Sequence, residues 1–204
     1  MPFDIPLQIL TLIALPTTLL YLGVIPLAWR GWVLIAVTLA VVGIMIRERW
    51  SPKDLGLRGD TLRSGWSRYG IVTLLGIAAI VGIAFVTGRR VLPAWWMAPH
   101  FLGGFLIVSI AQELVFRGFL IPKLHQLLRS PAFTILANAL LFTAVHAIFP
   151  SPAIVLPLTF VGGLLLALLY VRYPNLVLVT LAHIALNVTA TLYCFASTQT
   201  SCVA

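Results

Sequence analysis

Negative charge is scarce in this chain. Thirteen lysines and arginines stand against only five aspartates and glutamates, and Glu113 is the sole carboxylate side chain after Asp60. Charged residues make up 9% of the sequence, against about 25% in a soluble domain, while 61% of the residues are hydrophobic. These proportions exclude a water-soluble globular protein and predict a membrane protein.

Other patterns that define protein classes are also missing. The apolar runs lack the alternation of transmembrane β-strands, and no internal repeat points to a transporter built from duplicated halves. No CxxC motif provides a structural zinc site, and no small-residue cleavage site follows the first apolar run, so we expect no signal peptide. Only two cysteines occur, Cys194 and Cys202, and the sequence is equally compatible with a disulfide and with two free thiols.

What the sequence does contain is one apolar run after another, each long enough to cross a bilayer, which takes about 17–25 residues. We expect spans near residues 7–28, 31–46, 69–87, 100–121, 131–148, 153–171 and 175–195. These leave almost nothing for an extramembrane domain. The predicted fold class is therefore all-α, a polytopic transmembrane bundle of about seven helices that forms a single domain over residues 1–204.

Basic residues cluster between the second and third spans, where residues 47–68 hold six of the thirteen lysines and arginines. Positively charged loops stay on the cytoplasmic side, which predicts a cytoplasmic N-terminus. Lys123, Arg129 and Arg172 then fall on the same side. The loop would lie along the lipid headgroups, and its interleaved acidic residues argue against a nucleic-acid partner.

A short set of polar side chains lies inside the last four spans, where such groups are costly and usually mark function. They are Gln112, Glu113, Arg117, Asn138, His146, His183 and Asn187. Glu113 and Arg117 are four residues apart, as are His183 and Asn187, so each pair shares a helix face. Gln112 is rotated by about 100° from Glu113 and looks toward a different neighbour.

Helix geometry predicts that these groups lie at similar depths. Counting 1.5 Å per residue puts Glu113 and His146 at roughly 22 Å from the inner ends of their helices, and His183 at roughly 12–18 Å. Each residue also has a simpler structural interpretation: a lone histidine or Asn138 could serve packing alone, and an arginine one turn away makes Glu113 a reluctant base. Matching depth on three helices favours a shared site.

Three segments resemble the motifs of the CAAX-protease and bacteriocin-processing family of intramembrane endopeptidases. They are QELVFR (112–117), FTAVH (142–146) and HIALN (183–187), against family motifs that read Glu-Glu-x-x-x-Arg, Phe-x-x-x-His and His-x-x-x-Asn/Asp. LGLRGDTLRSGW (55–66) also resembles the segment before the family's core. The resemblance covers roughly residues 50–190.

The resemblance implies a mechanism. Position 112 would act with His146 to activate a water molecule, and His183 and Asn187 would stabilise the oxyanion of the tetrahedral intermediate.

Supporting roles follow in the same way. Arg117 would orient Glu113, and Phe142 would support the site. Two histidines with help from a carboxylate could hold zinc, but the metal-free, glutamate-type mechanism fits better because one of the implied site residues is an asparagine. We therefore expect no cofactor.

Gln112 departs from the family, which has its first glutamate at this position. An amide has nearly the shape of a carboxylate but cannot accept a proton as a base, so we expect this chain to bind substrate and barely cleave it. The sequence leaves three explanations open: a glutamate changed to glutamine to trap an inactive enzyme, which we favour, a natural pseudoprotease, and a mechanism in which Glu113 is the base.

The resemblance also suggests partners and location. The substrate would be a membrane-anchored protein or peptide in the bilayer, and we favour peptide maturation or removal of C-terminal sorting anchors over processing of prenylated proteins. A chain this short resembles prokaryotic members, which implies an inner or plasma membrane. Two other classes remain: a non-catalytic scaffold or regulator that binds transmembrane segments, and a small transporter with a proton relay.

Overall fold

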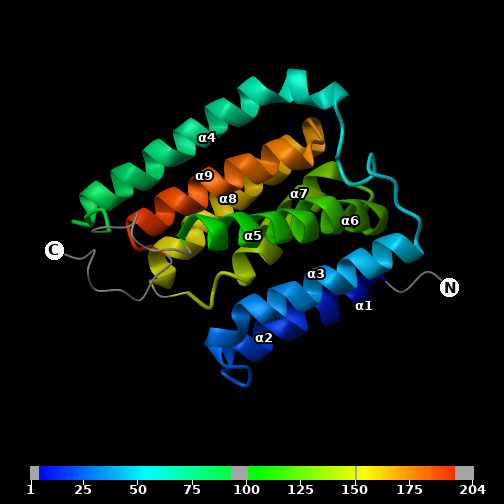
Figure 1. The fold of residues 1–204 in the computed structure, drawn as a ribbon, viewed down its shortest axis with the longest axis horizontal. Coiled ribbons are helices and arrows are strands. Elements are labelled where there is room, and N and C mark those ends of the chain that lie inside the picture. Colours follow the sequence, from blue (N-terminus) through cyan, green and yellow to red (C-terminus); the bar gives the residue numbers. More distant parts are fainter. Residues whose placement is uncertain (1–4, 93–100, 150, 196–204) are drawn as a thin grey trace.

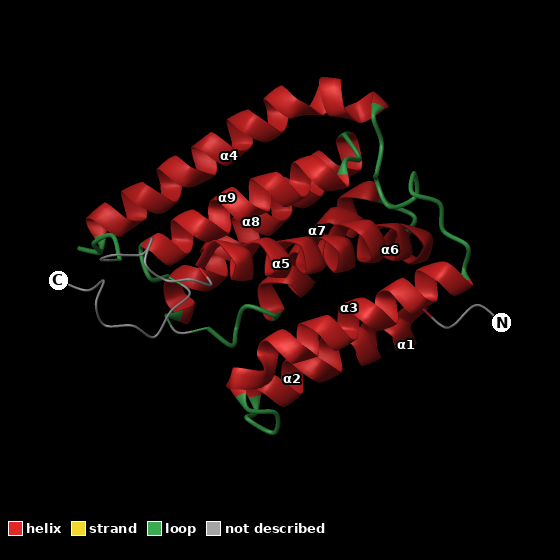
Figure 2. Ribbon diagram, viewed as in Figure 1, coloured by secondary structure: helices red, strands yellow, loops and turns green. Residues whose placement is uncertain are grey.

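The fold is known from a computed structural model, which describes residues 5–92, 101–149 and 151–195. These residues form helices and no β-sheet (Figure 2). Among them, three helices are long and apolar enough to cross a membrane, Leu27–Arg47, Asp60–Val86 and Pro152–Arg172. Shorter apolar helices run over Ile5–Tyr21, Pro131–Ala144 and Leu176–Leu192. The prediction of an all-α membrane bundle is confirmed.

The first two spans form a helical hairpin. The first is continuous through α1 (Ile5–Ile9), η1 (Leu10–Ala14) and α2 (Leu15–Tyr21), and a short turn, η2 (Leu27–Trp29), leads into α3 (Arg30–Arg47). The first helix ends at Tyr21 rather than near residue 28. Gly23 adopts a φ of +71°, a left-handed conformation that suits glycine and ends a helix.

The third span, α4 (Asp60–Val86), begins nine residues before the predicted residue 69. Two hydrogen bonds hold its start against the turn between the last two helices. The Thr61 hydroxyl donates to the Pro174 carbonyl at 2.7 Å, and the Asn175 side-chain amide donates to the Arg58 carbonyl at 2.7 Å. The polar residues from Asp60 onward, ahead of the apolar run, are therefore helical.

A long central helix carries the first motif. It is built from α5 (Phe101–Glu113), a wide π-helical segment η4 (Leu114–Leu120) and α6 (Ile121–Leu128), so it continues past the predicted end at residue 121. Pro122 lies in the first turn of α6. In a regular α-helix its ring would crowd the carbonyl of Gly118, and the wider turn before the proline accommodates it. The π-helical segment η1 precedes Pro16 in the same way.

The remaining helices are α7 (Pro131–Ala144), α8 (Pro152–Arg172) and α9 (Leu176–Leu192). Figure 1 shows α4 along one side of the molecule and the α1–α3 hairpin along the opposite side, with the other helices between them. α5 and η4 pack against α3 on one side and α9 on the other. Every residue from 115 to 120 is buried, so η4 lies at the centre of the bundle.

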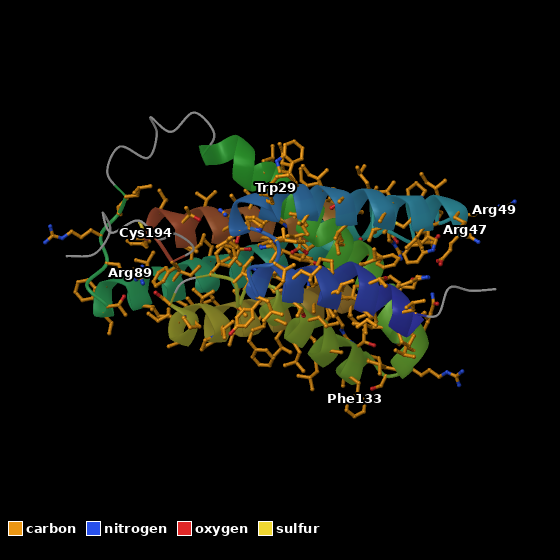
Figure 3. All side chains as sticks on the ribbon, turned by 90° about the horizontal axis from the view of Figure 1, so that it is seen from below. Trp29, Arg47, Arg49, Arg89, Phe133 and Cys194 are labelled. Atoms are coloured by element: carbon orange, nitrogen blue, oxygen red, sulfur yellow. The ribbon has the colours of Figure 1, made fainter. Side chains whose placement is uncertain are left out.

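Charged side chains mark the two ends of the bundle. Figure 3 shows Arg47 and Arg49 at one end, and Arg89 and Cys194 at the other. The basic segment thus lies at one end of the molecule, as a cytoplasmic anchor requires, and the membrane orientation itself stays a prediction. The prediction about a disulfide also involves Cys202, which lies outside the described residues.

Candidate functional site

Three polar side chains form a column on the central helix. Ser109 and Glu113 of α5 and Arg117 of η4 follow one another at intervals of four residues. None of the three exposes any surface. Buried polar groups persist in a membrane only where partners satisfy them, so the partners of this column define the site.

Arg117 is enclosed on three sides. Its Nη1 donates to Oε1 of Glu113 at 3.0 Å, and its Nη2 donates to the carbonyl of Gly163 in α8 at 3.3 Å. Its guanidinium carbon also lies 4.4 Å from the centre of the Phe142 ring, a cation–π distance. The arginine therefore neutralises the buried carboxylate and joins η4 to α7 and α8.

The column faces two polar residues of α9. Nδ1 of His183 lies 2.6 Å from Oε1 of Glu113, a short electrostatic contact whose angle is not that of a well-aligned hydrogen bond. One turn further, Nδ2 of Asn187 donates to the hydroxyl oxygen of Ser109 at 3.0 Å. Because the residue numbers run in opposite directions, α5 and α9 are antiparallel, and the two pairs form adjacent rungs between them.

Phe142 occupies the middle of the cluster. Its ring centre lies 4.6 Å from that of His146 and 5.5 Å from that of His183, and Phe116 packs edge-on at 5.2 Å. The ring thus contacts both imidazoles and the guanidinium of Arg117, and its supporting role stays a prediction.

His146 follows the C-terminal end of α7. Its Nδ1 lies 2.7 Å from the Phe142 carbonyl oxygen. A carbonyl only accepts hydrogen bonds, so the proton is assigned to Nδ1 and the lone pair to Nε2. In this tautomer Nε2 is the nitrogen that could accept a proton from water.

His146, His183 and Asn187 line one cavity of about 160 Å³. The rest of the lining is mostly apolar and comes from α4, α8 and α9, together with Phe142, Phe149 and Phe195. Together with the contact between Glu113 and His183, this brings four of the predicted site residues, from the central helix, α9 and the end of α7, into one buried cluster. Their catalytic roles stay predictions.

Gln112 lies elsewhere. Its half-buried side chain lines a second cavity of about 370 Å³, between the α1–α3 hairpin and the central helix. Gln112 and His146 therefore do not line the same cavity in this structure. Phe149 lines both cavities, and its ring centre lies 5.6 Å from that of His146. This one aromatic side chain is part of the wall between the two spaces.

Two groups of the cluster were not predicted from the sequence. Ser109 precedes Glu113 by four residues. The same spacing identified the pair of Glu113 and Arg117, so Ser109 could have been predicted from the sequence. The Gly163 carbonyl could not, because a main-chain acceptor leaves no mark in a sequence. Asn138, predicted to be a packing residue, is buried and donates to the Phe116 carbonyl at 2.7 Å.

The cluster offers a poor donor set for a metal ion. Oε1 of Glu113 is engaged by Arg117 and His183, and Asn187 is bound to Ser109. In the described part of the chain, no three histidine, cysteine, aspartate or glutamate residues lie close enough together to hold a metal. The residues present thus do not fit a zinc ion.

Comparison with known proteins adds one match. Residues 94–189 match the sequence profile of the family described as type II CAAX prenyl endopeptidase Rce1-like. No curated protein and no solved structure matches the chain. The matched range contains all three motifs, and the resemblance found in the sequence is confirmed.

Proposed function

Because residues 94–189 match the family described as type II CAAX prenyl endopeptidase Rce1-like, we propose that the polar cluster of this chain hydrolyses a peptide bond of a membrane-anchored protein or peptide. The observation that carries the proposal is the cavity around which His146, His183 and Asn187 gather. It lies within the bundle, where a carbonyl could meet both a base and hydrogen-bond donors.

In this proposal His183 and Asn187 form the oxyanion hole. When a tetrahedral intermediate forms, its oxygen becomes negative, and preorganised donors aimed at that oxygen lower the barrier. In this role His183 would donate a ring N–H to the oxygen, and Asn187 would donate the second N–H of its amide. The family resemblance assigns the same role to both residues.

Water activation involves His146 and position 112. Nε2 of His146 carries the free lone pair, and the family resemblance assigns a glutamate at position 112 as its partner in the base. In this structure Gln112 lines the neighbouring cavity beside Phe149, so the two groups would act together through a bridging water or after Phe149 moves. The amide of Gln112 cannot accept the proton. We therefore propose that substrate binding and oxyanion stabilisation are retained in this chain and that cleavage is slow.

Glu113 is a poor substitute for the missing base. Its side chain has no exposed surface, and one carboxylate oxygen contacts both Arg117 and His183. A base must reach the water it deprotonates directly or through one further water. This enclosure supports the interpretation in which position 112, not Glu113, limits the reaction.

The substrate class has two candidates. The family description names a CAAX prenyl endopeptidase, which suggests prenylated proteins, and the resemblance also allows peptide maturation or removal of C-terminal anchors. Both classes bring a peptide bond to a membrane boundary through a lipid or helical anchor, so both belong in the test. The proposed location is a prokaryotic inner or plasma membrane with the N-terminus in the cytoplasm.

Restoring the carboxylate tests the proposal. Gln112→Glu should raise the cleavage rate by about 10²–10⁴-fold, the usual contribution of a general base. The measurement uses protein in liposomes and two fluorogenic probes, a farnesylated CAAX peptide and a peptide with a C-terminal transmembrane anchor. The double variant Gln112→Glu/His146→Ala should return to the parent rate.

The rival function is a non-catalytic regulator that binds transmembrane segments, and Gln112 itself favours it. A regulator predicts that Gln112→Glu cleaves neither probe, while a membrane-protein partner still co-purifies after His146→Ala. That pair of results would overturn the proposed protease.

A further inference from the structure

On the basis of the function proposed above, we infer that Ser109 is a positioning residue for the oxyanion hole. Its hydroxyl fixes the direction of the Asn187 amide, so that the second N–H of that amide faces the cavity. The inference adds to the reaction a residue outside the three motifs.

The geometry restricts what Ser109 can do. Its side chain is fully buried and its hydroxyl oxygen accepts from Nδ2 of Asn187 at 3.0 Å. Ser109 lines neither cavity, so it does not reach a substrate. Its influence on the reaction can only pass through Asn187, which does line the site.

An amide needs such a partner because its two ends differ in chemistry and not in shape. Nδ2 carries two hydrogens that diverge in the amide plane, and binding one to Ser109 leaves the other for the cavity. Without this anchor the amide would be free to turn about its side-chain bonds, and the cavity would lose a donor held in one direction.

The enclosed position of Ser109 means that no other group can easily replace its hydrogen bond with Asn187. In an exposed site, water would take over the hydrogen bond of a deleted hydroxyl, but Ser109 has no exposed surface. The neighbouring rung, Glu113 with His183, lies one turn away on the same two helices. Side chains of α5 thus contact both proposed oxyanion donors of α9, His183 and Asn187.

The asparagine content of the chain allows a direct test. Only three asparagines occur, Asn138, Asn175 and Asn187, so asparagine-selective ¹⁵N labelling yields three side-chain NH₂ signals. Ser109→Ala in detergent micelles should shift and broaden the Asn187 pair, assigned by its loss in Asn187→Ala. Asn138 and Asn175, which bond to main-chain carbonyls elsewhere, serve as internal controls.

A matched variant guards against a general effect of losing a hydroxyl. Thr143 bonds only to the Ala139 carbonyl of its own helix, so Thr143→Ala should leave all three signals in place. An Asn187 signal that is unmoved in Ser109→Ala, or moved equally by Thr143→Ala, overturns the inference.

Kinetics test the consequence for catalysis in the Gln112→Glu background. Ser109→Ala should lower kcat about 5–20-fold, the order expected for one misdirected hydrogen bond, with little change in KM. In the Asn187→Ala background the same change should have no further effect. A purely structural serine would lower kcat by the same factor in both backgrounds, which would overturn the inference.

The two proposals fail separately. If Gln112→Glu cleaves neither probe, the proposed function fails, yet the NMR signal of Asn187 still decides whether Ser109 sets the direction of the amide. If cleavage is restored but the mutational effects are additive, the protease stands and the role of Ser109 is wrong.

Discussion

Arg117 has three partners in the polar cluster, because it binds Glu113, the Gly163 carbonyl and the face of Phe142 at once. The two Nη groups of its enclosed guanidinium donate to two different acceptors, an arrangement that requires arginine. A lysine has one point of charge and could not satisfy both acceptors in the same geometry.

Removal of this arginine should destabilise the fold. Arg117→Met leaves the Glu113 carboxylate buried without its cation, and the free energy of unfolding should fall by about 3–5 kcal/mol, as for other broken buried pairs. Thermal unfolding in detergent micelles, followed by circular dichroism, measures the change.

Arg172, exposed at the end of α8, is the matched control. Arg172→Met should change the unfolding free energy by less than about 0.5 kcal/mol. Similar stabilities for the two variants would show that the buried pair contributes no more than a surface charge.

At the scale of single residues, spacing predicted the pairs well. Four-residue intervals joined Glu113 to Arg117 and placed His183 and Asn187 on one helix face, and the rotation between positions 112 and 113 predicted that they face different neighbours. Spacing could not show which cavity Gln112 lines, because that depends on the α1–α3 hairpin and on Phe149, both distant along the chain.

Among the helices, the contact of α7 with α8 is set by one glycine. A Cβ atom added at Gly163 would lie 2.9 Å from Cδ1 of Phe142 and 3.6 Å from the backbone of Ala139. At neighbouring Gly162 an added Cβ meets nothing within 4 Å. Two adjacent glycines therefore offer a closely matched pair of variants.

Gly163→Ala should push Phe142 away from its site and destabilise the protein by about 1–3 kcal/mol, the usual effect of overpacking. In the Gln112→Glu background it should also lower the cleavage rate, because Phe142 contacts both imidazoles. Gly162 itself lines the cavity with His146, so its variant is a control for stability alone, and Gly162→Ala should leave the melting temperature unchanged. Melting curves make the comparison, and equal stabilities of the two variants would contradict the close packing of Phe142 against Gly163.

The helix boundaries show where sequence reasoning falls short. Hydropathy located every span, but it set the start of α4 at residue 69, since polar residues precede the apolar run. Hydrogen bonds from Thr61 and Asn175 extend the helix to Asp60, and both are contacts between segments more than a hundred residues apart. Hydropathy also does not show that a helix widens and continues, as the central helix does before Pro122.

For the whole molecule, one ion pair ties the N-terminal hairpin to the rest. Nζ of Lys123 lies 2.6 Å from both carboxylate oxygens of Glu48, and Lys123 is almost completely buried. Burial by itself would raise the pKa of Glu48, but hydrogen bonds from Lys123 and Trp50 outweigh it and lower that pKa below its ordinary value of 4.5.

Acid should therefore loosen this connection. A carboxyl group whose pKa is lower in the folded protein than in the unfolded chain stabilises the fold at a pH above its unfolded-state pKa. That contribution is lost as the pH falls through the folded-state pKa. Below pH 4.5 the free energy of unfolding of the parent should fall by up to about 1 kcal/mol more than that of Glu48→Gln, because a partly solvated ion pair contributes little more than this to stability. Melting curves from pH 7 to pH 3 measure the difference.

Lys123→Met offers a second check, because it removes the cation and should abolish most of the same acid-dependent loss. A parent protein and a Glu48→Gln variant that respond identically to acid would show that the pair does not hold the hairpin in place.

The arrangement of Glu113 and Arg117 also bears on biosynthesis. A single unpaired charge at the middle of a span opposes insertion by about 2.5–3.5 kcal/mol, and α8 and α9 are translated only after the central helix. Since the two opposite charges lie four residues apart on that one helix, they can neutralise each other before any later partner exists. The segment that carries the chemistry can therefore enter the lipid as an electrically neutral unit, without waiting for the rest of the polypeptide.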